Sequence, residues 1–324
     1  MPKSQNQKLK ILLLKDILYR YTDENHPLSA NSIIDTLREC DIEAERKSIY
    51  NDIENLASYG MDILKINGRE GGFFLGSREF ELAELKMLID AVQSSKFISG
   101  KKSEQLVKKI SELASVYDED ELKRQVYRVN NVKSQNENIL YIIDDINEAI
   151  RNNRKIDFKY LDWTTELKLK PRKNGEIYQV SPVSLIWDDE YYYLVAYDAE
   201  ADMIKHYRVD KMSDIAISEE ECDKHDKVKL EDYAGRVFGM FGGETVNVTV
   251  LCPKNKIGIL IDRFGQDIKI TAGDEETVKV HTDVVLSSQF YGWMASIGPD
   301  TRLVAPANAV EAYKTFLKDN LSRY

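Results

Sequence analysis

The chain has 324 residues, of which 43% are hydrophobic and 31% charged, so it is long enough for two or three folded domains. None of its apolar runs approaches the roughly 20 residues that span a membrane, and its N-terminus does not resemble a signal peptide. The net charge of −10 argues against a general polyanion binder, and the three dispersed cysteines argue against a disulfide framework or a zinc site. We therefore expect a cytoplasmic protein.

The N-terminal residues predict three helices followed by a hairpin. Helical periodicity starts at Leu9 and stops near the polar residues Thr22 to Asn25. Ser29 is a typical N-cap for the second helix, and the third runs from about Glu45 to Tyr59. Two apolar runs then flank a glycine-rich segment, which predicts a β-hairpin with strands Ile63 to Ile66 and Phe73 to Leu75. This order is that of a winged helix-turn-helix.

The outer face of the third helix carries side chains that can read DNA. Arg46 and Lys47 can reach guanine or phosphate, and Asn51 can pair with adenine. Other candidates for contact with DNA are Ser48 and Tyr50 on the same helix and Lys65 and Arg69 on the hairpin. The alternative is a helical interaction domain whose charged face is merely solvated.

The next segment predicts two helices that carry no candidate catalytic or binding residues. One covers Phe80 to Ser94, and a second apolar stripe runs from Leu106 to Tyr117 after a polar break at Ser99 to Ser103. We expect these helices to pair two protomers, which would present two recognition helices to two half-sites. An intramolecular linker bundle is the alternative.

A β-rich region follows a helix near Ile139 to Ile150. Its expected strands are Ile156 to Tyr160, Ile177 to Val180, Val183 to Trp187, Tyr191 to Tyr197 and Ile204 to Val209. Alternation along the last strand places His206, Arg208 and Asp210 on one face and Tyr207 and Val209 on the other.

Two of these strands carry a family resemblance. The string YYLVAYD at Tyr192 to Asp198 and the string KHYRVDKM at Lys205 to Met212 resemble the paired strands of WYL domains, with Tyr in place of the usual Trp. The string RKSIYNDIENLASYG resembles the recognition helix of WYL regulators. The resemblance implies an Sm-like β-barrel and maps the effector site onto Ser184, Tyr193, Lys205, His206 and Arg208. For any single tyrosine, the role of an ordinary strand residue is favoured over that of a ligand contact.

The C-terminal part resembles the extension that accompanies many WYL domains, down to FYGWMASIGPDTRLVAP at Phe290 to Pro306. That extension supplies a basic residue to a neighbouring WYL site, for which Arg263 and Arg302 are the candidates. Strands are expected near Val246 to Leu251 and Val278 to Val284, with a final helix from about Ala307 to Leu321. Gly235 to Glu244 lacks the Gly-Lys-Ser/Thr of a phosphate loop, so we interpret it as part of a hinge.

The expected fold class is thus α+β multidomain. The predicted parts are a winged helix-turn-helix (1–78), a helical dimerisation linker (79–136), an Sm-like β-barrel WYL domain (137–222), a hinge (223–243) and a C-terminal α/β extension domain (244–324).

These parts predict a homodimeric transcription regulator that binds operator DNA and senses a nucleotide or short single-stranded nucleic acid. The alternative is a single-stranded nucleic-acid-binding accessory protein, for instance in phage defence. We expect no enzyme, metal or cofactor, because the four histidines are dispersed and Cys252 has no nearby histidine.

Overall fold

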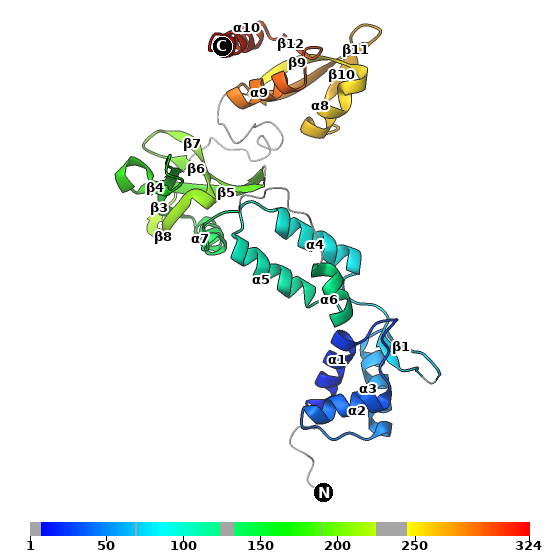
Figure 1. Ribbon diagram of the computed structural model, residues 1–324. Helices are drawn as coiled ribbons and strands as arrows, with labels where there is room; N and C mark the ends of the chain where they lie inside the picture. Colours follow the sequence, from blue (N-terminus) through cyan, green and yellow to red (C-terminus); the bar gives the residue numbers. More distant parts are fainter. Residues whose placement is uncertain (1–7, 69, 124–132, 189, 225–244) are drawn as a thin grey trace. The chain divides into compact units, whose positions relative to one another are not determined.

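The computed structural model describes residues 8–68, 70–123, 133–188, 190–224 and 245–324 (Figure 1). The chain divides into an N-terminal unit, Met1–Glu137, and a C-terminal unit, Asn138–Tyr324. No helix in the described part combines the length and apolar character that a membrane-spanning segment needs. Within the same residues, no three His, Cys, Asp or Glu side chains gather closely enough to hold a metal ion.

The N-terminal unit begins with three helices and a two-stranded antiparallel sheet, as the sequence predicts. They are α1 (Lys10–Tyr21), α2 (Ala30–Glu39), α3 (Arg46–Tyr59), β1 (Ile63–Lys65) and β2 (Phe73–Leu75). Ser29 caps α2 by accepting a hydrogen bond from the Ser32 N–H. Gly60 ends α3 in the left-handed region, with φ at 116°. The apolar stripes of the three helices meet in one core that includes Leu14, Ile33 and Ile49.

A close backbone contact holds the hairpin against the connection between α1 and α2. Leu28 and Phe73 exchange both backbone hydrogen bonds, with N···O distances of 2.9 and 2.8 Å. A Cβ atom at Gly72 would lie 2.3 Å from the Leu28 carbonyl carbon and oxygen, so only glycine fits there. The position of the hairpin therefore depends on this glycine.

Three further helices complete the N-terminal unit: α4 (Leu82–Ser94), α5 (Gly100–Ser111) and α6 (Val116–Lys123). They pack around Leu85, Ile89, Ala114 and Leu122. Two details of the prediction were wrong. The polar residues Ser99 to Ser103 start α5, because the Ser99 hydroxyl caps it through the Lys102 N–H. The apolar stripe through Tyr117 belongs to two helices, since the chain turns between Ser111 and Val116.

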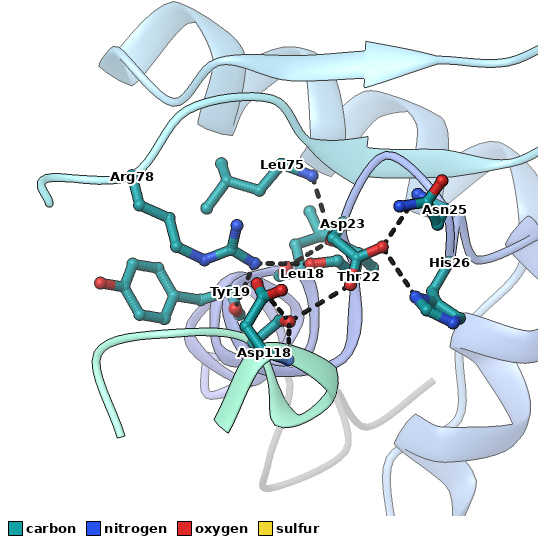
Figure 2. Close-up of polar contacts among 10 residues, drawn as sticks. Leu18, Tyr19, Thr22, Asp23, Asn25, His26, Leu75, Arg78 and Asp118 are labelled. Carbon is teal, nitrogen blue, oxygen red and sulfur yellow. Dashed lines mark hydrogen bonds and ion pairs between the residues drawn. The ribbon is translucent and has the colours of Figure 1, made fainter. Parts of the chain in front are cut away.

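A polar network ties the end of α1 to the start of α6 (Figure 2). The Asp23 carboxylate accepts hydrogen bonds from the Asn25 N–H (2.9 Å) and the Ser115 hydroxyl (3.2 Å) and contacts His26 Nδ1 at 2.7 Å. Burial acts to raise the pKa of Asp23, but the hydrogen bonds from His26 and Asn25 outweigh it and bring the pKa below its usual value. The His26 ring stacks on Tyr117, with 3.6 Å between centroids.

Two arginines strengthen the same junction. Arg20 donates to the carbonyls of Glu112 (2.8 Å) and Ala114 (2.9 Å) and pairs with the Glu119 carboxylate at 2.9 Å. On the other side of α1, Arg78 donates to the carbonyls of Tyr19 and Thr22, as Figure 2 shows. The end of α1 is thus linked both to α6 and to the segment that leaves β2.

The C-terminal unit opens with α7 (Ile139–Arg151) and a curled, fully antiparallel sheet. Its strands are β3 (Arg154–Trp163), β4 (Leu169–Pro171), β5 (Tyr178–Asp188), β6 (Tyr191–Asp198), β7 (Met203–Arg208) and β8 (Met212–Glu221). The order is β4-β3-β5-β6-β7, and β8 pairs with β3. The helix buries Ile142 and Ile146. Aromatic side chains pack together on one face of the sheet; Phe158 meets Tyr207 edge to face at 5.1 Å and stacks on Tyr178 at 5.6 Å.

The predicted strands of this sheet needed three corrections. The two strands expected on either side of Ser181 are one strand, β5, which continues through an irregularity between Pro182 and Ser184. The strands β4 and β8 were not predicted. β8 starts at the buried Met212, and the residues that follow alternate between half-buried and exposed. This alternation is the pattern of a strand with one face in solvent.

A second sheet with its own core lies toward the end of the chain. Its elements are β9 (Thr245–Pro253), α8 (Ile257–Phe264), β10 (Lys269–Ala272), β11 (Thr277–Val285), α9 (Ser288–Ser296), β12 (Arg302–Ala305) and α10 (Ala307–Leu321). The strand order is β10-β11-β9-β12, all antiparallel. The predicted strands and the final helix are confirmed, whereas α8, β10, α9 and β12 were not predicted. Residues 225–243 of the predicted hinge lie outside the described residues.

Candidate nucleic-acid interface and effector face

The outer face of α3 carries basic and aromatic side chains together with one exposed acid, Glu54. Arg46, Lys47 and Asn51 are exposed, and Tyr50 is half-buried beside them. Arg46 Nη2 donates to the Tyr50 hydroxyl at 3.3 Å, and its guanidinium lies 5.7 Å from the ring centroid. This hydrogen bond lowers the pKa of Tyr50. Arg46 and Tyr50, one helical turn apart, therefore form one polar unit on the surface.

The hairpin contributes a cation to the same surface. The Lys65 ammonium, on β1, lies 5.4 Å from the centroid of Tyr50 and 5.5 Å from that of Phe73. The rings of Tyr50 and Phe73 themselves meet edge to face at 5.5 Å. The structure therefore brings three predicted DNA-contacting residues together, namely Arg46, Tyr50 and Lys65, and Lys47 and Asn51 are exposed on the same helix. Arg69, the remaining hairpin candidate, lies outside the described residues.

Ser48 has a partner that the sequence analysis missed. Its hydroxyl oxygen accepts a hydrogen bond from the ammonium of Lys10, which also pairs with Asp52 at 2.6 Å. Lys10 is the first residue of α1 and only 6% exposed. A signal was available, because Lys10 stands one helical turn before the buried Leu14, where a core residue is expected.

The register of β5, β6 and β7 defines the second candidate site. Ser184 lies opposite Val195, which lies opposite His206, while Tyr193 lies opposite Arg208. Because side chains alternate along a strand, Ser184, Tyr193, His206 and Arg208 project from the same face of the sheet. We call this set the effector face.

Lys205 does not belong to the effector face. It lies opposite Ala196 and projects from the other side of β7, where its ammonium pairs with the Asp198 carboxylate at 2.5 Å. There it lines a cavity of about 150 Å³ together with Lys155 and Lys173. The sequence motif placed Lys205 with Arg208, but the pleat of the strand separates them.

Arg208 is held in place from several sides. Its guanidinium lies 3.6 Å from the centroid of the Tyr191 ring and forms a two-pronged hydrogen bond with Asp210, at 3.0 and 2.8 Å. Its backbone N–H donates to the buried Tyr160 hydroxyl at 3.0 Å. Burial acts to lower the pKa of Arg208, but the hydrogen bonds to Asp210 outweigh it and raise the pKa. Tyr191 and Asp210 are therefore parts of this face that the predicted site omitted.

His206 lies on the effector face, whereas the two candidate arginines lie in the C-terminal part. Burial lowers the pKa of His206, which favours a neutral imidazole near pH 7. Arg263 lies on α8, and Arg302 is the first residue of β12, an edge strand of the four-stranded sheet. Their roles in effector binding stay predictions.

Chemically, the effector face offers a flat cation stacked on a ring, next to a neutral imidazole and a hydroxyl. Asp210 already occupies one edge of the Arg208 guanidinium, and an aromatic ring offers a surface on which a base can stack. Because 28% of the Arg208 side chain is exposed, a ligand can reach it.

Among solved structures, the chain is similar to the proteasome accessory factor B/C (PafBC) of Arthrobacter aurescens, with 13% identity and a TM-score of 0.28. The match covers 100% of this chain and 51% of that chain, so the chain spans about half the length of PafBC. It is also similar to a CRISPR Cas-related protein, with 14% identity, a TM-score of 0.37 and coverage of 97% of this chain and 84% of that chain. No curated protein matches. The family model of the WYL domain matches residues 141–217, which hold most of α7 and the strands of the curled sheet. The chain therefore contains a WYL domain.

Proposed function

We propose that the chain is a DNA-binding transcription regulator whose WYL domain senses an anionic effector, a nucleotide or a short single-stranded nucleic acid. In this proposal residues 1–78 form a winged helix-turn-helix with α3 as the recognition helix, and two copies form a cytoplasmic homodimer without enzymatic activity. The observation that carries the proposal is the convergence of Arg46, Tyr50 and Lys65 from α3 and β1 on one exposed surface.

The charges of this surface support contact with DNA. Among the described residues, Arg46, Lys47 and Lys65 form no ion pair with a carboxylate, so their charges are available to phosphate. By contrast, the arginine of α2, Arg38, is paired with Asp35 at 2.8 Å. The net charge of −10 weakens sequence-independent binding to DNA. The local basic surface of α3 and β1 can still bind a specific DNA sequence.

Selection of genomic fragments tests the DNA-binding half of the proposal. The purified protein is mixed with fragments of its own genome at near-physiological salt, and the retained DNA is sequenced. We expect enrichment of a paired half-site. The Arg46→Ala and Asn51→Ala variants should bind the enriched duplex about 5- to 100-fold more weakly, as expected when one base or phosphate contact is lost. Arg38→Ala is the matched control and should bind as the wild type does.

The alternation of side chains along β7 supplies a control for the effector-binding part of the proposal. Arg208 and Lys205 are both cations on β7, but only Arg208 projects from the effector face. The ligands to be screened are nucleotides and oligonucleotides of about 4 to 16 residues, the range of site sizes known for OB folds that bind single strands. Arg208→Ala should lose the ligand that binds, whereas Lys205→Ala should keep it. Equal losses in both variants would contradict the assignment of the face.

The accessory-protein alternative is favoured by one observation, the stack of Arg208 on Tyr191, because such a pair suits an unpaired base. Tight binding of a single-stranded oligonucleotide by a protein that enriches no genomic duplex would support that alternative over the regulator.

A further inference from the structure

The buried ammonium of Lys10 is placed beneath the recognition helix. It reaches from the first residue of α1 to Ser48 and Asp52 of α3, and the Lys10 and Asp52 side chains are 8% and 13% exposed. Ser48 and Asp52 lie one helical turn apart, so a single ammonium can contact both. Lysine is rarely this buried unless its charge is paired, and here Asp52 supplies the opposite charge.

The ion pair leaves the local net charge at zero. Removing Lys10 alone would leave the Asp52 carboxylate buried without a partner, which is strongly destabilising. Replacing both partners by apolar side chains of similar size is often neutral for stability. An effect on DNA binding can therefore be separated from an effect on folding.

Ser48 gains a defined orientation from this contact. An ammonium has only donors, so the Ser48 oxygen must be the acceptor and its own proton is left for another acceptor. Ser48 is only half-buried and stands in the first turn of α3, next to the exposed Arg46 and Lys47. Since Lys10 approaches from the core side, the hydroxyl proton is directed toward the surface. A phosphate oxygen of DNA is an acceptor of the right kind.

We propose that Lys10 is a positioning residue for DNA binding, which orients the Ser48 hydroxyl so that it donates to a backbone phosphate. This inference rests on the proposed function, because it assigns a role within the DNA-binding surface of α3. Lys10 itself does not touch DNA. Its contribution passes through Ser48.

The test compares the K10M/D52L, S48A and K10M/D52L/S48A variants of the full chain on the duplex that the wild type enriches from its genome. The pair replacement leaves the net charge unchanged, so a loss of affinity is not a general charge effect. We expect S48A to weaken binding about tenfold, the usual value of one hydrogen bond to a charged group. K10M/D52L should show the same loss, and the triple variant no further loss.

Two controls separate positioning from folding. The midpoint of urea unfolding, followed by far-ultraviolet circular dichroism, should be the same for K10M/D52L and the wild type. Lys15 is an exposed lysine on the same helix, and K15M should leave the affinity within about twofold of the wild type.

The proposal is overturned if a stable K10M/D52L protein binds the duplex as the wild type does, or if its loss and that of S48A multiply in the triple variant. If the wild type enriches no duplex at all, the proposed function fails and this inference fails with it. The two failures are therefore distinguishable.

Discussion

Replacing Arg20 by alanine should release α6 from the end of α1. Arg20 makes two hydrogen bonds to carbonyls and one ion pair, all at 2.8 to 2.9 Å. Hydrogen bonds to charged groups contribute about 1.5–3 kcal/mol. Because 27% of the Arg20 side chain is exposed, solvent screening reduces this to about 1 kcal/mol per contact, or about 3 kcal/mol in total.

Hydrogen exchange measured by mass spectrometry can detect this loss. A decrease of about 3 kcal/mol in the free energy of local opening accelerates the exchange of amide protons about 100-fold. The change should appear in peptides that cover Val116–Lys123 and not in those from α2. Tryptophan fluorescence cannot replace this assay, because Trp163, Trp187 and Trp293 all belong to the C-terminal unit.

Arg38→Ala is the control, since the Arg38–Asp35 pair is exposed on both sides, at 66% and 67%, and should contribute little. If Arg20→Ala left the exchange of α6 within about twofold of the wild type, the junction would not depend on this arginine.

Three further predictions concern stability. Gly72→Ala forces a Cβ against the Leu28 carbonyl and should cost about 1–3 kcal/mol, measured as a lower urea midpoint by circular dichroism; an unchanged midpoint would contradict the tight contact. Tyr160→Phe removes the acceptor of the Arg208 N–H and should cost about 1–3 kcal/mol in urea unfolding followed by tryptophan fluorescence, with Tyr141→Phe as the exposed control. Because burial lowers the pKa of His206, the unfolded chain binds the proton more readily, so stability should fall as the pH drops through 6.5 toward the lower folded pKa. His206→Gln should flatten that slope, and an equal slope in both proteins would refute the reasoning.

Elements set by local chemistry could be predicted closely. The final helix has the predicted bounds, Ala307–Leu321, and α2 starts after the Ser29 cap. Caps and helical periodicity depend on neighbouring residues only, so a single sequence contains them. The turn between α5 and α6 was missed because the apolar stripe continues through it, and only packing on Leu85 and Ile89 shows that two helices share it.

For the candidate effector site, strand alternation was a better guide than the family motif. Strand alternation already placed His206 and Arg208 together, and the register confirms that placement. The motif added Lys205, which the same alternation excludes. Tyr191 and Asp210 were missed as partners of Arg208, because a stack and a two-pronged hydrogen bond depend on side-chain conformations that spacing does not determine.

Contacts between distant residues could not be predicted at all. The ion pair of Lys10 with Asp52 and the clamp of Arg20 on Glu119 join residues from different helices. A lysine in a stripe of core residues indicates that its charge has a partner. Which residue is the partner depends on how the helices pack, and the sequence does not show that.

The contacts drawn in Figure 2 join the end of α1 to both α6 and the segment that follows β2. Asp23 accepts a hydrogen bond from Ser115, just before α6, and Arg78, just after β2, donates to the Thr22 carbonyl. Because both contacts are made at the same end of α1, we expect α4–α6 to move together with α1 and not to bend at residue 78. In the proposed regulator, a rotation of α4–α6 would therefore also displace the outer face of α3, where the proposed DNA contacts lie.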